Sequence, residues 1–71
     1  MRVIYDPETD TVSIVFREAP VKESDELREG LILDYGEDGR AVSIELLDAA
    51  ESIAEPQGIH YEMKGNKIAV L

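Results

Sequence analysis

Three acidic residues near the start of the chain alternate as the first ligands of a calcium-binding loop do. Asp6, Glu8 and Asp10 could together supply several carboxylate oxygens, the ligands that hard cations prefer. The central glycine and the later bidentate glutamate of an EF-hand are missing, however, and Pro7 is typical of a plain β-turn. The pattern therefore favours a turn whose acids face water over a metal site.

The single histidine lies two residues before an acid. His60 and Glu62 would share one face of a strand, and this spacing could orient an imidazole or supply two metal ligands. A catalytic metal site needs a third ligand, but the chain has no second histidine and no cysteine. His-x-Glu also begins the zinc deaminase signature, whose Pro-Cys-x-x-Cys half is absent. We therefore interpret both residues as exposed strand positions.

The sequence also lacks the motifs of a catalytic serine and of a phosphate-binding loop. The serines have only His60 available as a base, and none lies in a Gly-x-Ser-x-Gly elbow. The glycines at residues 36–39 flank two acids where a phosphate cradle needs bare amides or a lysine. We therefore predict no catalytic residue, no cofactor, no metal ligand and no enzymatic activity. A small metal-dependent enzyme is the least favoured alternative.

Length and composition limit what the chain can build. With 71 residues there is room for one domain, which we place at residues 1–71, and its core must be small. The absence of cysteine excludes disulfides, thiol catalysis and cysteine-based zinc sites. Stabilisation from a partner or a second copy is therefore expected.

The charge balance is strongly acidic. Sixteen acidic against seven basic residues give a net charge of -9, which disfavours binding to nucleic acid by the chain alone or to an anionic membrane. A solvated acidic surface that guards sheet edges is one interpretation, and complementarity to a basic protein is the other. With no apolar run of signal or membrane-spanning length, we predict a soluble, cytoplasmic protein.

The segments that position these residues alternate as β-strands do. Residues 2–6 and 11–17 predict a hairpin around a turn at residues 7–10. Its apolar side chains should share one face, namely those of Val3, Tyr5, Val12, Ile14 and Phe16. At residues 21–29 we expect an edge strand near 22–27, because a helix there would be too short to be stable before Gly30 ends it.

The clearest signal is at residues 30–48. Two alternating apolar runs flank an Asp38-Gly39 turn and predict a hairpin. Asp48 then takes the place of an N-cap, and Glu51 completes the spacing of a capping box for a short helix near residues 48–54. Residues 59–71 predict a further hairpin that closes the molecule or joins the sheet edge. The fold class is therefore α+β, mostly β, with an antiparallel sheet of about five to seven short strands and one short helix.

The face opposite the predicted core also carries apolar residues. These are Ile4, Val15, Ile32 and Leu47, which we take as a candidate interface. An antiparallel sheet with one wet side should be polar there, so something should cover part of this face. Either the C-terminal hairpin folds over it or another subunit does, and closed dimers are the commonest soluble oligomers.

Three segments carry a resemblance to a known family: Val3-Ile4-Tyr5-Asp6-Pro7-Glu8-x-Asp10, the strand at residues 12–16, and GLILDYGEDGRAVSIELLDA at residues 30–49. Over roughly residues 2–54 the chain resembles the prokaryotic family of small proteins catalogued as domain of unknown function 2283. The resemblance implies a β-rich fold with a short helix and no assigned activity, cofactor or catalytic residue. Some members look like neighbours of small toxin-type proteins, which makes an antitoxin role conceivable. The hairpin at residues 59–71 lies outside the shared pattern.

Two function classes follow. The first is a non-catalytic interaction module that binds a copy of itself, most simply as a homodimer, or another protein. The second is an antitoxin-like acidic partner that masks the basic surface of a toxin, with acids at residues 23–29 steering the encounter.

Overall fold

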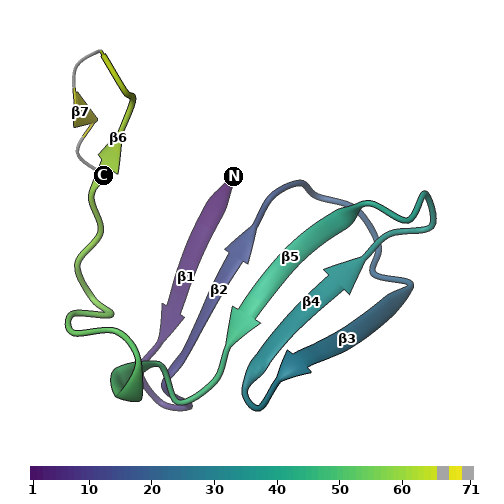
Figure 1. The fold of residues 1–71 in the computed structure, drawn as a ribbon, viewed down its shortest axis with the longest axis horizontal. Coiled ribbons are helices and arrows are strands. Elements are labelled where there is room, and N and C mark those ends of the chain that lie inside the picture. The colour runs from purple at the N-terminus through teal and green to yellow at the C-terminus, as the bar shows by residue number, and fades with distance from the viewer. Residues whose placement is uncertain (66–67, 70–71) are drawn as a thin grey trace.

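The computed structural model describes residues 1–65 and the backbone of residues 68–69, and its regular secondary structure is almost entirely β-strand (Figure 1). The strands are β1 (Arg2–Asp6), β2 (Thr11–Val15), β3 (Glu23–Arg28), β4 (Leu31–Tyr35), β5 (Ala41–Leu46), β6 (Tyr61–Glu62) and β7 (Ile68–Ala69). One 3-10 turn, η1 (Ala49–Glu51), follows β5. The predicted fold class is confirmed, as is the edge strand expected near residues 22–27.

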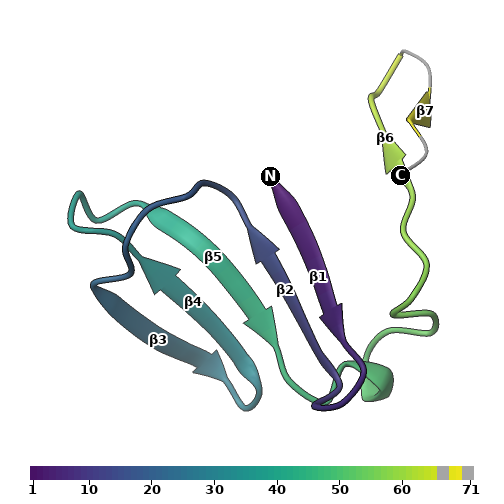
Figure 2. The ribbon, with the colours of Figure 1, turned by 180° about the vertical axis from the view of Figure 1, so that it is seen from behind.

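The first five strands form one antiparallel sheet in the order β1-β2-β5-β4-β3. Three hairpin neighbours, β1 with β2, β3 with β4 and β4 with β5, follow from short connections, and Gly39 adopts the left-handed φ of 78° that its turn requires. The pairing of β2 with β5 joins residues about thirty positions apart and holds the two halves together. Figure 2 shows the same single sheet from behind.

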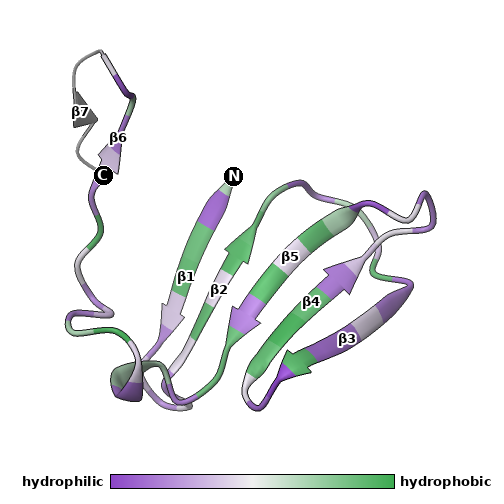
Figure 3. Ribbon diagram, in the orientation of Figure 1, coloured by the Kyte–Doolittle hydropathy of each residue, from purple (hydrophilic) through white to green (hydrophobic). Residues whose placement is uncertain are grey.

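The register sorts the side chains onto two faces. One row crosses four strands as Val3, Ile14, Ile44 and Leu33, because each is the direct partner of the next. We call this side the apolar face, and its members are Val3, Tyr5, Val12, Ile14, Leu31, Leu33, Val42, Ile44 and Leu46. The mixed face opposite carries Ile4, Ser13, Val15, Ile32, Asp34, Ser43 and Glu45. Figure 3 shows hydrophobic positions on each of the central strands β2, β5 and β4. The predicted shared face of Val3, Tyr5, Val12 and Ile14 is confirmed.

The predicted helix near residues 48–54 is only the single turn η1, and the predicted capping box is wrong. Asp48 is itself left-handed (φ 51°, ψ 49°), and its side chain caps no backbone N–H. The carboxylate of Asp10 in the β1–β2 turn takes this role, since it accepts a hydrogen bond from the backbone N–H of Ala50 at 3.1 Å. The carbonyl of Asp10 accepts a second bond from the N–H of Ala49 at 2.9 Å.

The C-terminal hairpin forms a separate two-stranded sheet of β6 and β7. It projects beyond the β1 side of the main sheet, so the expectation that it joins the sheet or covers its second face is wrong (Figures 1 and 2). The connecting segment contains Pro56 and Gly58 and forms no strand, and among the described strands β6 and β7 pair only with each other. Residues 66–67 of the predicted turn and residues 70–71 of the predicted last strand lie outside the described residues.

The sheet buries very little. Only Val12, Val42 and Ala49 are buried apolar residues in the described part of the chain, and no large side chain there is fully enclosed. The radius of gyration is 13.4 Å, against roughly 11 Å expected for a compact domain of this length. None of the described helices has the length and apolar character needed to cross a membrane. Over the described residues, the main sheet is therefore a single layer without the second layer that a domain normally has.

Candidate functional site

The apolar face is the largest candidate site. Leu33 and Ile44 are direct cross-strand partners in its middle row, and both are only half-buried. At its β1 margin Val3 is 39 % exposed, and Phe16, just beyond β2, is 43 % exposed. Figures 1 and 2 show no described helix or strand stacked over it. Exposed apolar surfaces of this kind are typical of sites that bind proteins, membranes or ligands.

The four residues proposed from the sequence lie on or beside the mixed face. Ile4 and Leu47 are exposed, whereas Val15 and Ile32 are half-buried. Ser13 and Glu45 lie between Ile4 and Ile32 in the same cross-strand row, so polar side chains separate the apolar ones. The sequence interpretation treated the apolar face as a closed core. The signal it missed is that a chain this short, with one short predicted helix, has no second layer to close it.

A hydroxyl–carboxylate cluster occupies the centre of the mixed face. Asp34 is only 4 % exposed, and its carboxylate accepts hydrogen bonds from the hydroxyls of Ser24 at 2.6 Å and Ser43 at 2.7 Å. Burial alone would raise the pKa of Asp34, but the hydroxyl bonds stabilise the anion and lower its pKa below the ordinary value. The buried charge is thus satisfied by groups from β3 and β5, and this cluster ties three strands together.

Glu45 on β5 is the second acid of this face and behaves in the opposite way. A hydrogen bond shared with Asp34, then burial and the charge of Asp34, raise the pKa of Glu45. Two carboxyls with separated pKa values are one signature of acid–base sites. Neither residue, however, is among those that line the cavity described below, at the β4–β5 turn. We interpret the pair as structural.

Glu45→Gln is expected to raise the melting temperature at pH 7 by a few degrees. At that pH the wild-type Glu45 is ionised beside another carboxylate, whereas the amide removes the like charge and keeps the shape. A raised folded-state pKa means that Glu45 contributes stability below its unfolded pKa and loses it as the pH rises, so the gain should vanish in melts near pH 4. Glu23→Gln, on the exposed β3 edge, is the control and should show no such pH-dependent gain.

Two acids of the first hairpin, Asp6 and Asp10, accept hydrogen bonds from groups of the same hairpin. The carboxylate of Asp6 accepts a hydrogen bond from the N–H of Glu8 at 2.9 Å, and Asp10 accepts one from the hydroxyl of Tyr5 at 2.8 Å. The bond to Asp10 raises the pKa of Tyr5. Within the described residues, no group of three or more histidines, cysteines or acids is arranged to hold a metal ion. His60 and Glu62 are both exposed on or beside β6, away from the main sheet.

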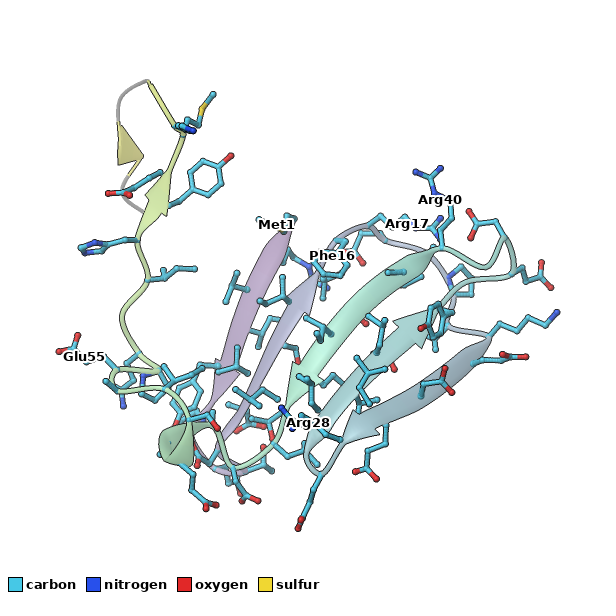
Figure 4. All side chains as sticks on the ribbon, in the orientation of Figure 1. Met1, Phe16, Arg17, Arg28, Arg40 and Glu55 are labelled. Atoms are coloured by element: carbon cyan, nitrogen blue, oxygen red, sulfur yellow. The ribbon has the colours of Figure 1, made fainter. Side chains whose placement is uncertain are left out.

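A cavity of about 590 Å³ opens beside the β4–β5 turn. It is lined by Arg17, Ala19, Pro20, Val21, Lys22, Gly36, Glu37 and Asp38. The guanidinium of Arg17 donates to the carbonyls of Ala41 at 3.2 Å and Arg40 at 3.1 Å and to the carboxylate of Asp38 at 2.7 Å. Figure 4 shows Arg17 beside Arg40 near this turn.

The backbone N–H of Arg40 and the guanidinium of Arg17 lower the pKa of Asp38. The ion pair of Arg17 and Asp38 therefore connects the β4–β5 turn to the end of β2. We interpret the cavity as a consequence of that turn rather than as a built binding site.

The comparisons with known proteins give one result. A family model described as "Protein of unknown function (DUF2283)" matches residues 2–49. The match includes all five strands of the main sheet and ends at the start of η1, whereas β6 and β7 lie outside it. Neither the search of curated proteins nor that of solved structures gave a match.

Proposed function

Because the chain belongs to the DUF2283 family of proteins of unknown function, we propose its role from geometry alone. It is a non-catalytic interaction module that assembles with itself: the apolar face of one copy stacks on the same face of a second copy. The observation that carries the proposal is the single-layer sheet, in which the nine-residue apolar face has no covering element in the described chain. Two such sheets stacked face to face make a sandwich about 10 Å thick with a shared core.

The exposed area supports this role. The chain exposes 5715 Å², whereas a compact monomer of its 7.9 kDa mass exposes roughly 4,400 Å². The excess of about 1,300 Å², to which the open sheet and the projecting C-terminal segment both contribute, is on the order of the area that one subunit buries in an obligate dimer. A second copy of the sheet is therefore a sufficient partner in size.

The charge distribution also favours a twofold stack. The acids that share this side of the sheet, Glu23 and Asp25, belong to the β3 edge and would remain at the solvated rim. The mixed face, by contrast, already satisfies its buried carboxylate with hydroxyl groups and needs no cover. A closed dimer joined by one self-complementary face is also the commonest oligomer of soluble proteins.

Sedimentation equilibrium on the wild-type chain tests the proposal. We expect a mass above that of the 7.9 kDa monomer at micromolar concentration, and a melting temperature that rises with protein concentration. Because apolar stacking is insensitive to screening, the association should persist in high salt. A chain that remains monomeric with an unchanged melting temperature over two decades of concentration would contradict the proposal.

The second candidate is an antitoxin-like acidic partner of a basic protein. The net charge of -9 and the exposed acids of β3, Glu23, Asp25 and Glu26, favour it. This role predicts capture of a basic protein encoded next to the gene, lost when salt is raised to 0.5 M or above, together with a free chain that is monomeric. The measurements of mass and of salt dependence therefore separate the two candidates.

A further inference from the structure

The two edge strands of the main sheet differ in how readily they can pair with an additional strand. The β3 edge carries three acids, Glu23, Asp25 and Glu26, and like charges on an edge strand discourage pairing. The β1 edge carries one residue of each sign, Arg2 and Asp6, at the two ends of an apolar centre. Among the described strands β1 pairs only with β2, so its outer backbone groups are available. One edge is thus protected and the other is open.

We infer that β1 pairs with β1 of a second copy, antiparallel and centred on Ile4, so that two sheets continue into one sheet of ten strands. In this register Arg2 lies opposite Asp6 of the second copy, Val3 lies opposite Tyr5, and Ile4 meets its own equivalent. Directly opposite residues of an antiparallel pair have Cβ atoms about 5 Å apart, so the ion pair forms twice. The strand is therefore self-complementary in charge and in apolar character.

This edge interface goes beyond the face stacking proposed above and does not depend on it. The twofold axis of an antiparallel edge pair is perpendicular to the sheet, so both apolar faces stay on the same side of the ten-stranded sheet. Two such sheets could then stack by those faces into a tetramer. If only one interface exists, the protein is a dimer of the corresponding type.

The existing contacts of the two charged residues leave room for this pairing. The Nε of Arg2 donates to Glu18 at 2.7 Å, but both side chains are largely exposed, at 59 % and 72 %, and the other guanidinium donors are available. Asp6 uses one carboxylate oxygen for the N–H of Glu8. The competing occupant of the edge is the chain's own β6–β7 hairpin, which projects on this side in Figure 1.

Cysteine cross-linking of the full chain tests the inference, since the sequence has no cysteine of its own. In Ile4→Cys the two thiols would face each other across the twofold axis, and mild oxidation with copper phenanthroline should give a covalent dimer on a non-reducing gel. Glu26→Cys, exposed in the middle of the β3 edge, is the matched control and should cross-link several-fold less.

Charge reversal then tests the register. In the Ile4→Cys background, Arg2→Glu and Asp6→Arg should each lower the cross-linked fraction several-fold, because each places like charges opposite one another. The double variant, Arg2→Glu with Asp6→Arg, restores opposite charges and should recover the cross-link. Circular dichroism confirms that each variant is folded.

Equal cross-linking of Ile4→Cys and Glu26→Cys, or no cross-linking of Ile4→Cys, would overturn the inference. Occupation of the edge by the β6–β7 hairpin gives the second of these results. Neither result bears on face stacking, because that interface is tested by a substitution on the apolar face, Leu33→Glu, and not by a cross-link through β1.

Discussion

Leu33→Glu is expected to weaken self-association about 100-fold or more, so that the face-stacked assembly dissociates at micromolar concentration. Leu33 lies in the middle row of the apolar face, between Ile44 on β5 and Asp25 on the β3 edge, and a twofold stack would bury it in both copies. Losing two buried leucine side chains costs about 3 kcal/mol or more per dimer, before the cost of burying two carboxylates. Sedimentation equilibrium against the wild type measures the change in Kd.

The matched control is its neighbour on the same strand. Ile32 is half-buried like Leu33 but points to the mixed face, because successive residues of a strand alternate. Ile32→Glu should therefore leave the face-stacked association intact. The reverse result, with Ile32→Glu dissociating the protein and Leu33→Glu not, would contradict stacking through the apolar face and favour the interface of Ile4, Val15, Ile32 and Leu47.

Asp34→Ala is expected to lower the free energy of unfolding by about 2–3 kcal/mol, a large fraction of the stability of a small domain. The substitution removes a charged acceptor from two hydroxyls, and Ser43 is itself buried. Urea unfolding followed by circular dichroism, at one fixed protein concentration, measures the change. Asp25→Ala on the exposed β3 edge is the control and should change the free energy by less than about 0.5 kcal/mol.

The pH dependence provides a second check on the Asp34 cluster. Because its folded-state pKa is lowered, Asp34 contributes stability above its unfolded pKa and loses it as the pH falls through the folded-state value. The difference in stability between wild type and Asp34→Ala should therefore be largest near neutral pH and shrink in strong acid. A difference that stays constant from pH 7 to pH 2 would show that the charge of Asp34 is not what stabilises the cluster.

Local signals in the sequence were sufficient for the strands and turns. Alternation over residues 2–6 and 31–35 and the Asp38-Gly39 pair predict hairpins that the structure contains, because side-chain period and turn conformation are properties of neighbouring residues. The prediction that Asp48 caps a helix was wrong because the observed partner is distant in the sequence. The carboxylate that meets the N–H of Ala50 belongs to Asp10, forty positions away, and no local pattern reports such a partner.

The Asp34 cluster was missed in the same way. Within β4, Asp34 is an ordinary polar residue between apolar ones, and only the pairing of β4 with both β3 and β5 brings the hydroxyls of Ser24 and Ser43 to its carboxylate. The neighbours of the candidate interface residues also depend on the strand order. Ile4 and Ile32 share a face by alternation, yet the strand order places Ser13 and Glu45 between them.

The sequence by itself therefore determined the family, the acidic charge, the hairpins and which side of each strand is apolar, since all of these depend on composition or on near neighbours. Only the tertiary structure decided the strand order, the pairing of β2 with β5 and the open apolar face. Those features depend on contacts between segments far apart in the chain, and on whether any segment remains to cover the sheet. In this protein the described segments leave it uncovered, and this is the basis for proposing a second copy as its partner.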